Sequence, residues 1–154
     1  MKNFQTRSVE QPQKDRKLNA PSVTEYMVKD LITFTPDTEI KEVIQTLLDN
    51  RITGAPVLND KREVVGLVDD KDCLNVLVSS AYYNQPVEKD TVSKYMTSVM
   101  KSISVHDDIV DVANIFVQSK YKRLLVMDDE GRLVGQISRR DILRAIKDLN
   151  ANTW

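Results

Sequence analysis

Two stretches of the chain carry apolar residues at alternating spacings of three and four, the pattern of a helix that buries one side. Mostly polar residues occupy the positions between them. Each stretch therefore predicts an amphipathic helix packed on a core. The apolar positions are Ile40, Val43, Ile44, Leu47 and Leu48 in the first helix and Ile109, Val112, Ala113, Phe116 and Val117 in the second.

Short runs rich in β-branched and apolar residues flank these helices and predict strands. We expect one brief strand before each helix, and after it two strands joined by a polar turn and followed by another helix. A capping box at Ser22 and Glu25 predicts a short lead helix, and Gly54 is interpreted as a left-handed helix cap. The expected strands are residues 31–35, 55–58 and 64–68, then 101–105, 123–127 and 132–137.

The same order of elements occurs twice. Gly66 and Gly135 stand 69 residues apart, as do Asp72 and Asp141, with no insertion or deletion between the copies. A sheet with helices on one face needs cover on the other, so we expect an α/β (α+β) fold of two pseudo-twofold-related β-α-β-β-α units packed sheet to sheet. The expected parts are a disordered leader (1–21), unit one (22–83), a linker (84–90), unit two (91–150) and a tail (151–154).

Length and charge limit the function. A chain of 154 residues buries roughly 68–70% of its unfolded surface and needs no covalent staples. The formal charge of −1 gives no broad basic field, so we expect no nucleic-acid partner. One cysteine, no apolar run of membrane length and no secretion signal lead us to expect a cytoplasmic protein without membrane contact.

Several motifs in this order resemble a tandem pair of cystathionine-β-synthase (CBS) domains, called a Bateman module. Tyr-Met opens each copy, Thr-Pro precedes the first long helix, and a Gly-x-x-Ser-x-x-Asp pattern closes copy two. The residues that carry the resemblance are Tyr26-Met27, Tyr95-Met96, Thr35-Pro36, Gly54-Ala-Pro-Val57, Lys122-Arg-Leu-Leu-Val126 and Gly135-Gln-Ile-Ser138-Arg-Arg-Asp141.

The resemblance implies a regulatory module that binds an adenosine nucleotide (AMP, ADP or ATP), with S-adenosylmethionine or another adenosyl ligand as the alternative. It also implies a homodimer, formed through the helices that end each copy, that acts on a separate, unknown protein. The implied binding residues are Ser102, Ile103, Lys122, Arg123, Leu124, Leu125, Ser138, Arg139, Arg140 and Asp141 in copy two, with Thr33, Ala55, Pro56 and Asp72 in copy one.

Physical roles for these residues agree with that implication. The carboxylate of Asp141 can accept ribose hydroxyls, while Ser138 and the free N–H groups of the helix start face a phosphate. Arg139 and Arg140 can reach the same phosphate. Adenine is expected in a slot between the strand 102–103 and the backbone of 124–125, with 122–123 at its rim. Gly135 signals a close approach to the strand backbone.

Other readings stay open. The Ser138 to Asp141 spacing also fits an ordinary N-cap, and both roles can coexist. In copy one, Asp69 replaces the hydroxyl and stands with Asp70 and Asp72, which together repel a phosphate. We therefore expect that cleft to be empty or to take an uncharged adenosine group, in preference to a cation. Copy two has Leu125 where copy one has a proline, which weakens the slot.

Catalysis is not expected. His106 precedes a helix as a cap or surface residue, and Cys73 aligns with Ile142 as a small core residue. We find no P-loop, metal-spaced Cys/His set or nucleophile elbow, and so expect neither catalytic nor metal residues. The alternative function is a ligand-free dimerisation or interaction module; a nucleotide-processing enzyme lacks an evident base or nucleophile.

Overall fold

The computed structural model describes residues 19–83, 90–98 and 100–153. Most of the expected leader (1–21) and linker (84–90) lies outside these ranges. The last helix continues through Thr153, into the segment expected as the tail. In chain order the elements are η3 (Val23–Glu25), α1 (Ile40–Asn50), β1 (Gly54–Leu58), β2 (Val64–Asp69), α2 (Asp70–Tyr83), α3 (Val92–Tyr95), β3 (Ser102–Ser104), α4 (Ile109–Gln118), β4 (Arg123–Met127), β5 (Leu133–Ser138) and α5 (Arg139–Thr153).

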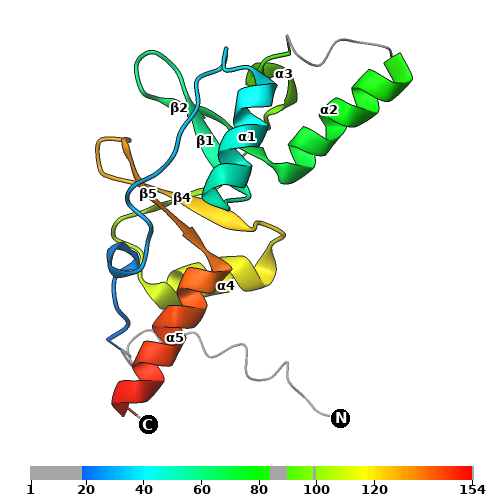
Figure 1. Cartoon of the computed structure of the whole chain (residues 1–154). Helices are drawn as coiled ribbons and strands as arrows, with labels where there is room; N and C mark the ends of the chain where they lie inside the picture. The colour runs from blue at the N-terminus through cyan, green and yellow to red at the C-terminus, as the bar shows by residue number, and fades with distance from the viewer. Residues whose placement is uncertain (1–18, 84–89, 99, 154) are drawn as a thin grey trace.

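Two small sheets form the middle of the molecule (Figure 1). Helices α1, α2 and α3 lie toward one end, and α4 and α5 lie toward the other. Strands β1 and β2 pair antiparallel, whereas β3, β4 and β5 form one sheet in which β3 and β4 run parallel. The predicted mixed α/β fold of two repeated units is confirmed.

The first strand expected in copy one is reduced to a single bridge. Phe34 pairs with Val57 in parallel, but residues 31–35 form no strand. In copy two the N–H groups of Leu125 and Val105 donate to neighbouring chain carbonyls in this region. Their repeat mates are Pro56 and Pro36, and proline has no N–H to donate. The two prolines therefore remove the bonds that would extend the bridge into a strand.

The first long helix ends differently from the prediction. Arg51, and not Gly54, adopts the left-handed conformation with φ of 54°, and its N–H reaches the carbonyls of Leu47 and Leu48. Gly54 is the first residue of β1. The capping box of Ser22 and Glu25, in contrast, is present as predicted and opens η3.

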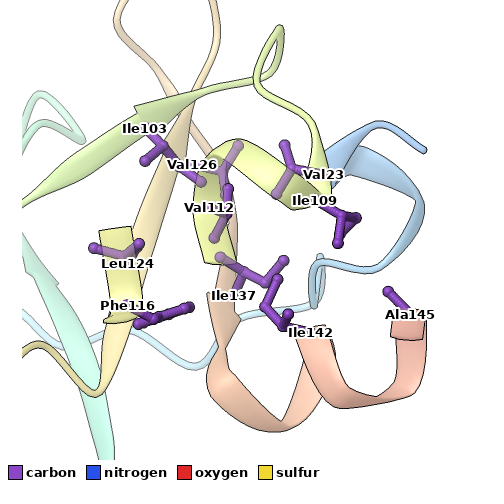
Figure 2. Packing of buried hydrophobic residues seen from close by; sticks show 10 residues of the cluster. All are labelled: Val23, Ile103, Ile109, Val112, Phe116, Leu124, Val126, Ile137, Ile142 and Ala145. Atoms are coloured by element: carbon purple, nitrogen blue, oxygen red, sulfur yellow. The ribbon is translucent and has the colours of Figure 1, made fainter. Parts of the chain in front are cut away.

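The lead helices are exchanged between the copies. Val23 of η3 is fully buried in the core of copy two (Figure 2), and its N–H donates to the carbonyl of Asp107 at 3.0 Å. Val92 of α3 is fully buried in the core of copy one, and its N–H donates to the carbonyl of Thr38 at 2.8 Å. Each copy thus completes the hydrophobic core of the other.

The methionine of each Tyr-Met pair crosses over with its helix. A Cβ on Gly135 would lie 2.5 Å from Sδ of Met27, and a Cβ on Gly66 would lie 2.4 Å from Sδ of Met96. The expected close approach to the backbone of Gly135 therefore exists. The approaching group is the thioether of the other copy, which packs where a side chain would collide.

Candidate ligand-binding clefts

Two clefts lie between the copies and are related by the repeat. The first cleft has a volume of about 460 Å³ and the second about 250 Å³. Each of the eleven residues that line the second has its mate, 69 positions away, in the first. The second is lined by Leu67, Asp69, Lys71, Thr97, Met100, Lys101, Lys120, Tyr121, Lys122, Arg123 and Leu125.

The first cleft joins residues from both copies. Copy one contributes an apolar wall together with Asp30, Arg51 and Thr53, and copy two contributes polar and cationic groups. The wall consists of Val28, Leu31, Ile32, Ile52 and Pro56, with Gly54 beside it; the groups from copy two are Lys122, Arg123, Gln136, Ser138 and Arg140. Four cations and one carboxylate thus line a cleft of small-molecule size.

Five of the predicted binding residues meet in the first cleft: Pro56, Lys122, Arg123, Ser138 and Arg140. The others do not line it. Ser102 is exposed on β3, Ile103 and Leu124 are buried in the core of copy two, and Ala55 is buried in that of copy one. Leu125 lines the second cleft, and Thr33 lines a third cleft near the hairpin turns.

The residues of the adenine slot expected within copy two thus do not line the first cleft together, and this cleft lies between the copies. Ser138 shares this cleft with Leu31 and Ile32 and with Thr53, Gly54 and Pro56, which are copy-one residues. The exchanged lead segment causes this pairing, because the main chain of Val28 bridges to Gln136 on β5 through hydrogen bonds of 2.8 and 3.0 Å. Segment 28–32 thus lies against the end of the copy-two hairpin.

Asp141 caps the start of α5. Its Oδ2 accepts the N–H of Ser138 at 2.8 Å and the hydroxyl of Ser138 at 3.1 Å, and its Oδ1 accepts Arg144 at 2.7 Å. Asp141 is 7% exposed as a whole residue and does not line the cleft. Asp141 therefore performs the capping role in this structure and fixes the hydroxyl of Ser138.

The neighbouring arginines separate. Arg140 lines the first cleft, whereas Arg139 donates to the carbonyl of Tyr121 at 3.2 Å. Of the two guanidinium groups predicted to reach one phosphate, only that of Arg140 lines the first cleft. Arg51 and Arg123 also bring guanidinium groups to the first cleft, and that of Arg123 donates to the hydroxyl of Thr53.

The acidic start of α2 is balanced in an unexpected way. Asp69 and Asp72 each accept the backbone N–H of the other, at 2.9 and 3.0 Å. Asp69 lines the second cleft, but so do five cations contributed mainly by copy two: Lys71, Lys101, Lys120, Lys122 and Arg123. These cations, which the sequence did not predict at this cleft, oppose the repulsion that the carboxylates exert on a phosphate.

Burial raises the pKa of Asp72 to about 6, and the charges of Asp69 and Asp70 add to this shift, although the N–H of Asp69 opposes it. Burial also raises the pKa of the neighbouring Cys73 thiol to about 11, again with help from the carboxylates. Cys73 is therefore a poor nucleophile at neutral pH. The described residues include no group of three His, Cys, Asp or Glu side chains able to hold a metal ion.

Sequence reasoning missed several cleft residues. Arg51 was not predicted as a cleft residue, because the sequence placed the left-handed cap of α1 at Gly54 and not at Arg51. Gln136 carries no motif signal, yet its side-chain oxygen is buried and accepts no hydrogen bond from the described residues. Lys101 and Lys120, which line the second cleft, were also missed, because their mates Ile32 and Arg51 in the first cleft carry no motif signal either.

The CBS-domain family model matches residues 23–79 and 92–148, and the chain belongs to this family of tandem CBS domains. Among curated relatives it is 34% identical over 149 residues to the chloroplastic CBS domain-containing protein CBSX1 of Arabidopsis thaliana. That match covers 80% of this chain and 63% of the relative. The chain therefore spans less than two thirds of the length of this relative.

Solved structures share the fold. CBSX2 of Arabidopsis thaliana, crystallised in complex with AMP, superposes with a TM-score of 0.73 at 24% identity, covering 84% of this chain and 98% of that one. The CBS domain pair of MJ0100, in complex with 5'-methylthioadenosine and S-adenosyl-L-methionine, gives 0.71 at 22% identity and the same coverage. Within the described ranges no helix combines the length and the hydropathy needed to cross a bilayer.

Proposed function

We propose that this chain is a regulatory module, not an enzyme, that binds an adenosine nucleotide in the first cleft and thereby changes the activity of a partner protein in the cytoplasm. AMP, ADP and ATP are the first candidates, and S-adenosylmethionine is the alternative. The observation that carries the proposal is one cleft of about 460 Å³ in which an apolar wall faces four cations.

Each part of the nucleotide has a matching group. The apolar wall suits the faces of adenine, and the buried oxygen of Gln136 suits its amino group, because an unsatisfied buried acceptor is costly. Ser138, Arg140 and the N-terminus of α5 suit a phosphate. The adenosyl ligands bound by CBSX2 and MJ0100 support this choice of ligand class. A ribose contact for Asp141 belongs to the proposal.

Thermal unfolding with adenosyl compounds tests the proposal. A ligand at about 100 times its Kd stabilises the folded state by about 2.7 kcal/mol, which raises Tm by roughly 5–10 °C in a chain of this size. We expect such a rise with at least one of AMP, ADP, ATP and S-adenosylmethionine, and a smaller one with GMP. If no adenosyl compound raises Tm, the proposal fails.

Matched variants identify the cleft. Arg140→Gln removes a cation from the first cleft and Lys71→Gln removes its repeat mate from the second. We expect Arg140→Gln to reduce the Tm rise with AMP by at least half and Lys71→Gln to preserve most of it. The reverse order would move the principal site to the second cleft. Asp141 is unsuitable for this test because its replacement also removes the cap of α5.

We also propose that two chains pair through their helices. Exposed apolar residues recur at repeat-related positions: Leu48 and Val117, Leu74 and Leu143, and Leu77 and Ile146 are 44% to 82% exposed. These side chains lie on α1, α2, α4 and α5. Exposed apolar positions that follow the repeat support a symmetric contact between modules.

A further inference from the structure

Arg123 lies between the two clefts. It and Lys122 are the residues that line both. The guanidinium of Arg123 reaches across from copy two and donates to the hydroxyl of Thr53 in copy one. Gly54 leaves the room for it, because a Cβ there would lie 2.5 Å from Nη1 and 2.9 Å from Cζ of Arg123.

Copy one has no arginine equivalent to Arg123. The repeat mate of Arg123 is Gly54, so the pseudo-twofold axis does not generate a second guanidinium at this place. A second link also starts from copy two: Arg139, between the first-cleft residues Ser138 and Arg140, donates to the carbonyl of Tyr121, which lines the second cleft. The mate of Arg139 is Asp70, which has no N–H to donate from its side chain.

We infer that Arg123 is a specificity-determining residue shared by the two clefts, and that phosphate-bearing ligands in them compete for its guanidinium. Charge-assisted hydrogen bonds from an arginine are among the stronger ones, and a phosphate that engages Arg123 from one cleft leaves the other with one cation fewer. Two nucleotides therefore bind less tightly together than each does alone. An uncharged nucleoside makes no demand on Arg123, so its two binding events are independent. This inference rests on the proposed function.

Single-cleft variants make the coupling measurable. Leu31 and Met100 are repeat mates that line the first and the second cleft, respectively. Leu31→Trp and Met100→Trp each fill one cleft, so calorimetric titration of each variant gives the association constant of the other cleft with its neighbour blocked. Without coupling, the product of the two constants of the wild-type chain equals the product of the constants of the two variants.

For AMP we expect the product of the two wild-type association constants to be at least about fivefold smaller than the product of the two variants' constants. A factor of five is the lower end of typical coupling between sites. For adenosine we expect equality within about twofold. When Arg123→Gln is added to the wild-type chain and to both single-cleft variants, the two products for AMP should become equal as well. Lys122→Gln, which removes the same charge from a residue that lines both clefts, should retain the coupling. Unfolding curves of every variant show whether it is folded.

Different results separate the two proposals. Equal AMP products in the wild-type background overturn the coupling, as does a second cleft that takes up no AMP when the first is blocked. Coupling that survives Arg123→Gln, or that disappears in Lys122→Gln alone, overturns the role of Arg123. If no adenosyl compound binds the wild-type chain, the proposed function fails and the coupling fails with it.

Discussion

Asp72 and Asp141 occupy equivalent positions at the starts of α2 and α5, yet their surroundings differ. Asp141 accepts hydrogen bonds from Ser138 and from Arg144. Asp72 stands beside Asp69 and Asp70, and burial together with these charges raises its pKa to about 6. One position of the repeat thus holds a carboxylate bonded to a hydroxyl and a guanidinium in copy two, and a carboxylate next to two others in copy one.

Replacing Asp72 by Asn is expected to stabilise the protein at pH 7.5. The folded-state pKa of about 6 lies above the ordinary 3.8, so ionisation of Asp72 costs stability fully above pH 6 and not at all below about pH 4. After allowance for solvent screening, Asp72→Asn should raise the free energy of unfolding at pH 7.5 by about 1 kcal/mol. This corresponds to a rise in Tm of roughly 2–4 °C.

The gain should disappear as the pH falls from 6 to 4, which thermal unfolding at both ends of this range checks. Asp141→Asn is the matched control, and it should lower Tm at pH 7.5 because it weakens the bonds to Ser138 and Arg144. A gain from Asp72→Asn that is independent of pH would contradict the account, since it would have to come from packing and not from charge.

Single residues set the limit of what the sequence could predict about the site. Ser138 and Arg140 were placed correctly at a helix start because a repeated motif marks that position. The partner wall was expected from residues 102–103 and 124–125, although it consists of copy-one residues, among which only Pro56 is the counterpart of one of these. Sequence offset shows which residues are equivalent, but it does not show whether equivalent residues pack within a copy or across the pair.

At the scale of elements, the lead helices decide that question. Most helices and strands were predictable from periodicity and turns. The strand expected at 31–35 does not form, because two prolines cannot donate the hydrogen bonds that it would need. Pro36 and Pro56 were treated as family markers, but both also lack the N–H groups that their mates Val105 and Leu125 donate in copy two. Local patterns could not reveal the exchange of η3 and α3, since each helix would have been equally amphipathic in either place.

Val23 and Val92 provide a reciprocal test of the exchange of the lead helices. They are repeat mates, and each is 0% exposed. Truncation of either to Ala should cost about 2 kcal/mol of stability. Hydrogen exchange followed by mass spectrometry should show faster exchange in α4 and β5 for Val23→Ala and in α1 and β1 for Val92→Ala. Faster exchange of α1 in Val23→Ala, with α4 unchanged, would mean that η3 packs on its own copy.

At the scale of the whole molecule, the proposed pairing of two chains rests on the exposed apolar helix positions. Leu74 on α2 and Leu143 on α5 are mates that are 66% and 64% exposed. We expect the wild-type chain to sediment as a dimer and the Leu74→Glu/Leu143→Glu variant as a monomer with nearly unchanged Tm when ligand-free. Val110→Glu is the control, because Val110 is 46% exposed but its mate is the polar Lys41.

Analytical ultracentrifugation at micromolar concentration distinguishes these results. A wild-type chain that sediments as a monomer would contradict the pairing, and a double variant that stays dimeric would assign the contact to another surface. The stand-alone interaction module remains the alternative function. It would be favoured if the dimer forms while no adenosyl compound changes Tm.

Each half of this chain holds part of the interior of the other, and this has a consequence for fragments. A cut in the peptide chain between Tyr83 and Asp90 would not yield two autonomous folding units, because the amino-terminal piece keeps Val23 in its neighbour and the carboxyl-terminal piece keeps Val92 in return. The pieces would remain associated by complementation, as in a domain-swapped pair of single repeats. The covalent connection between the copies therefore chiefly fixes their stoichiometry and raises their local concentration.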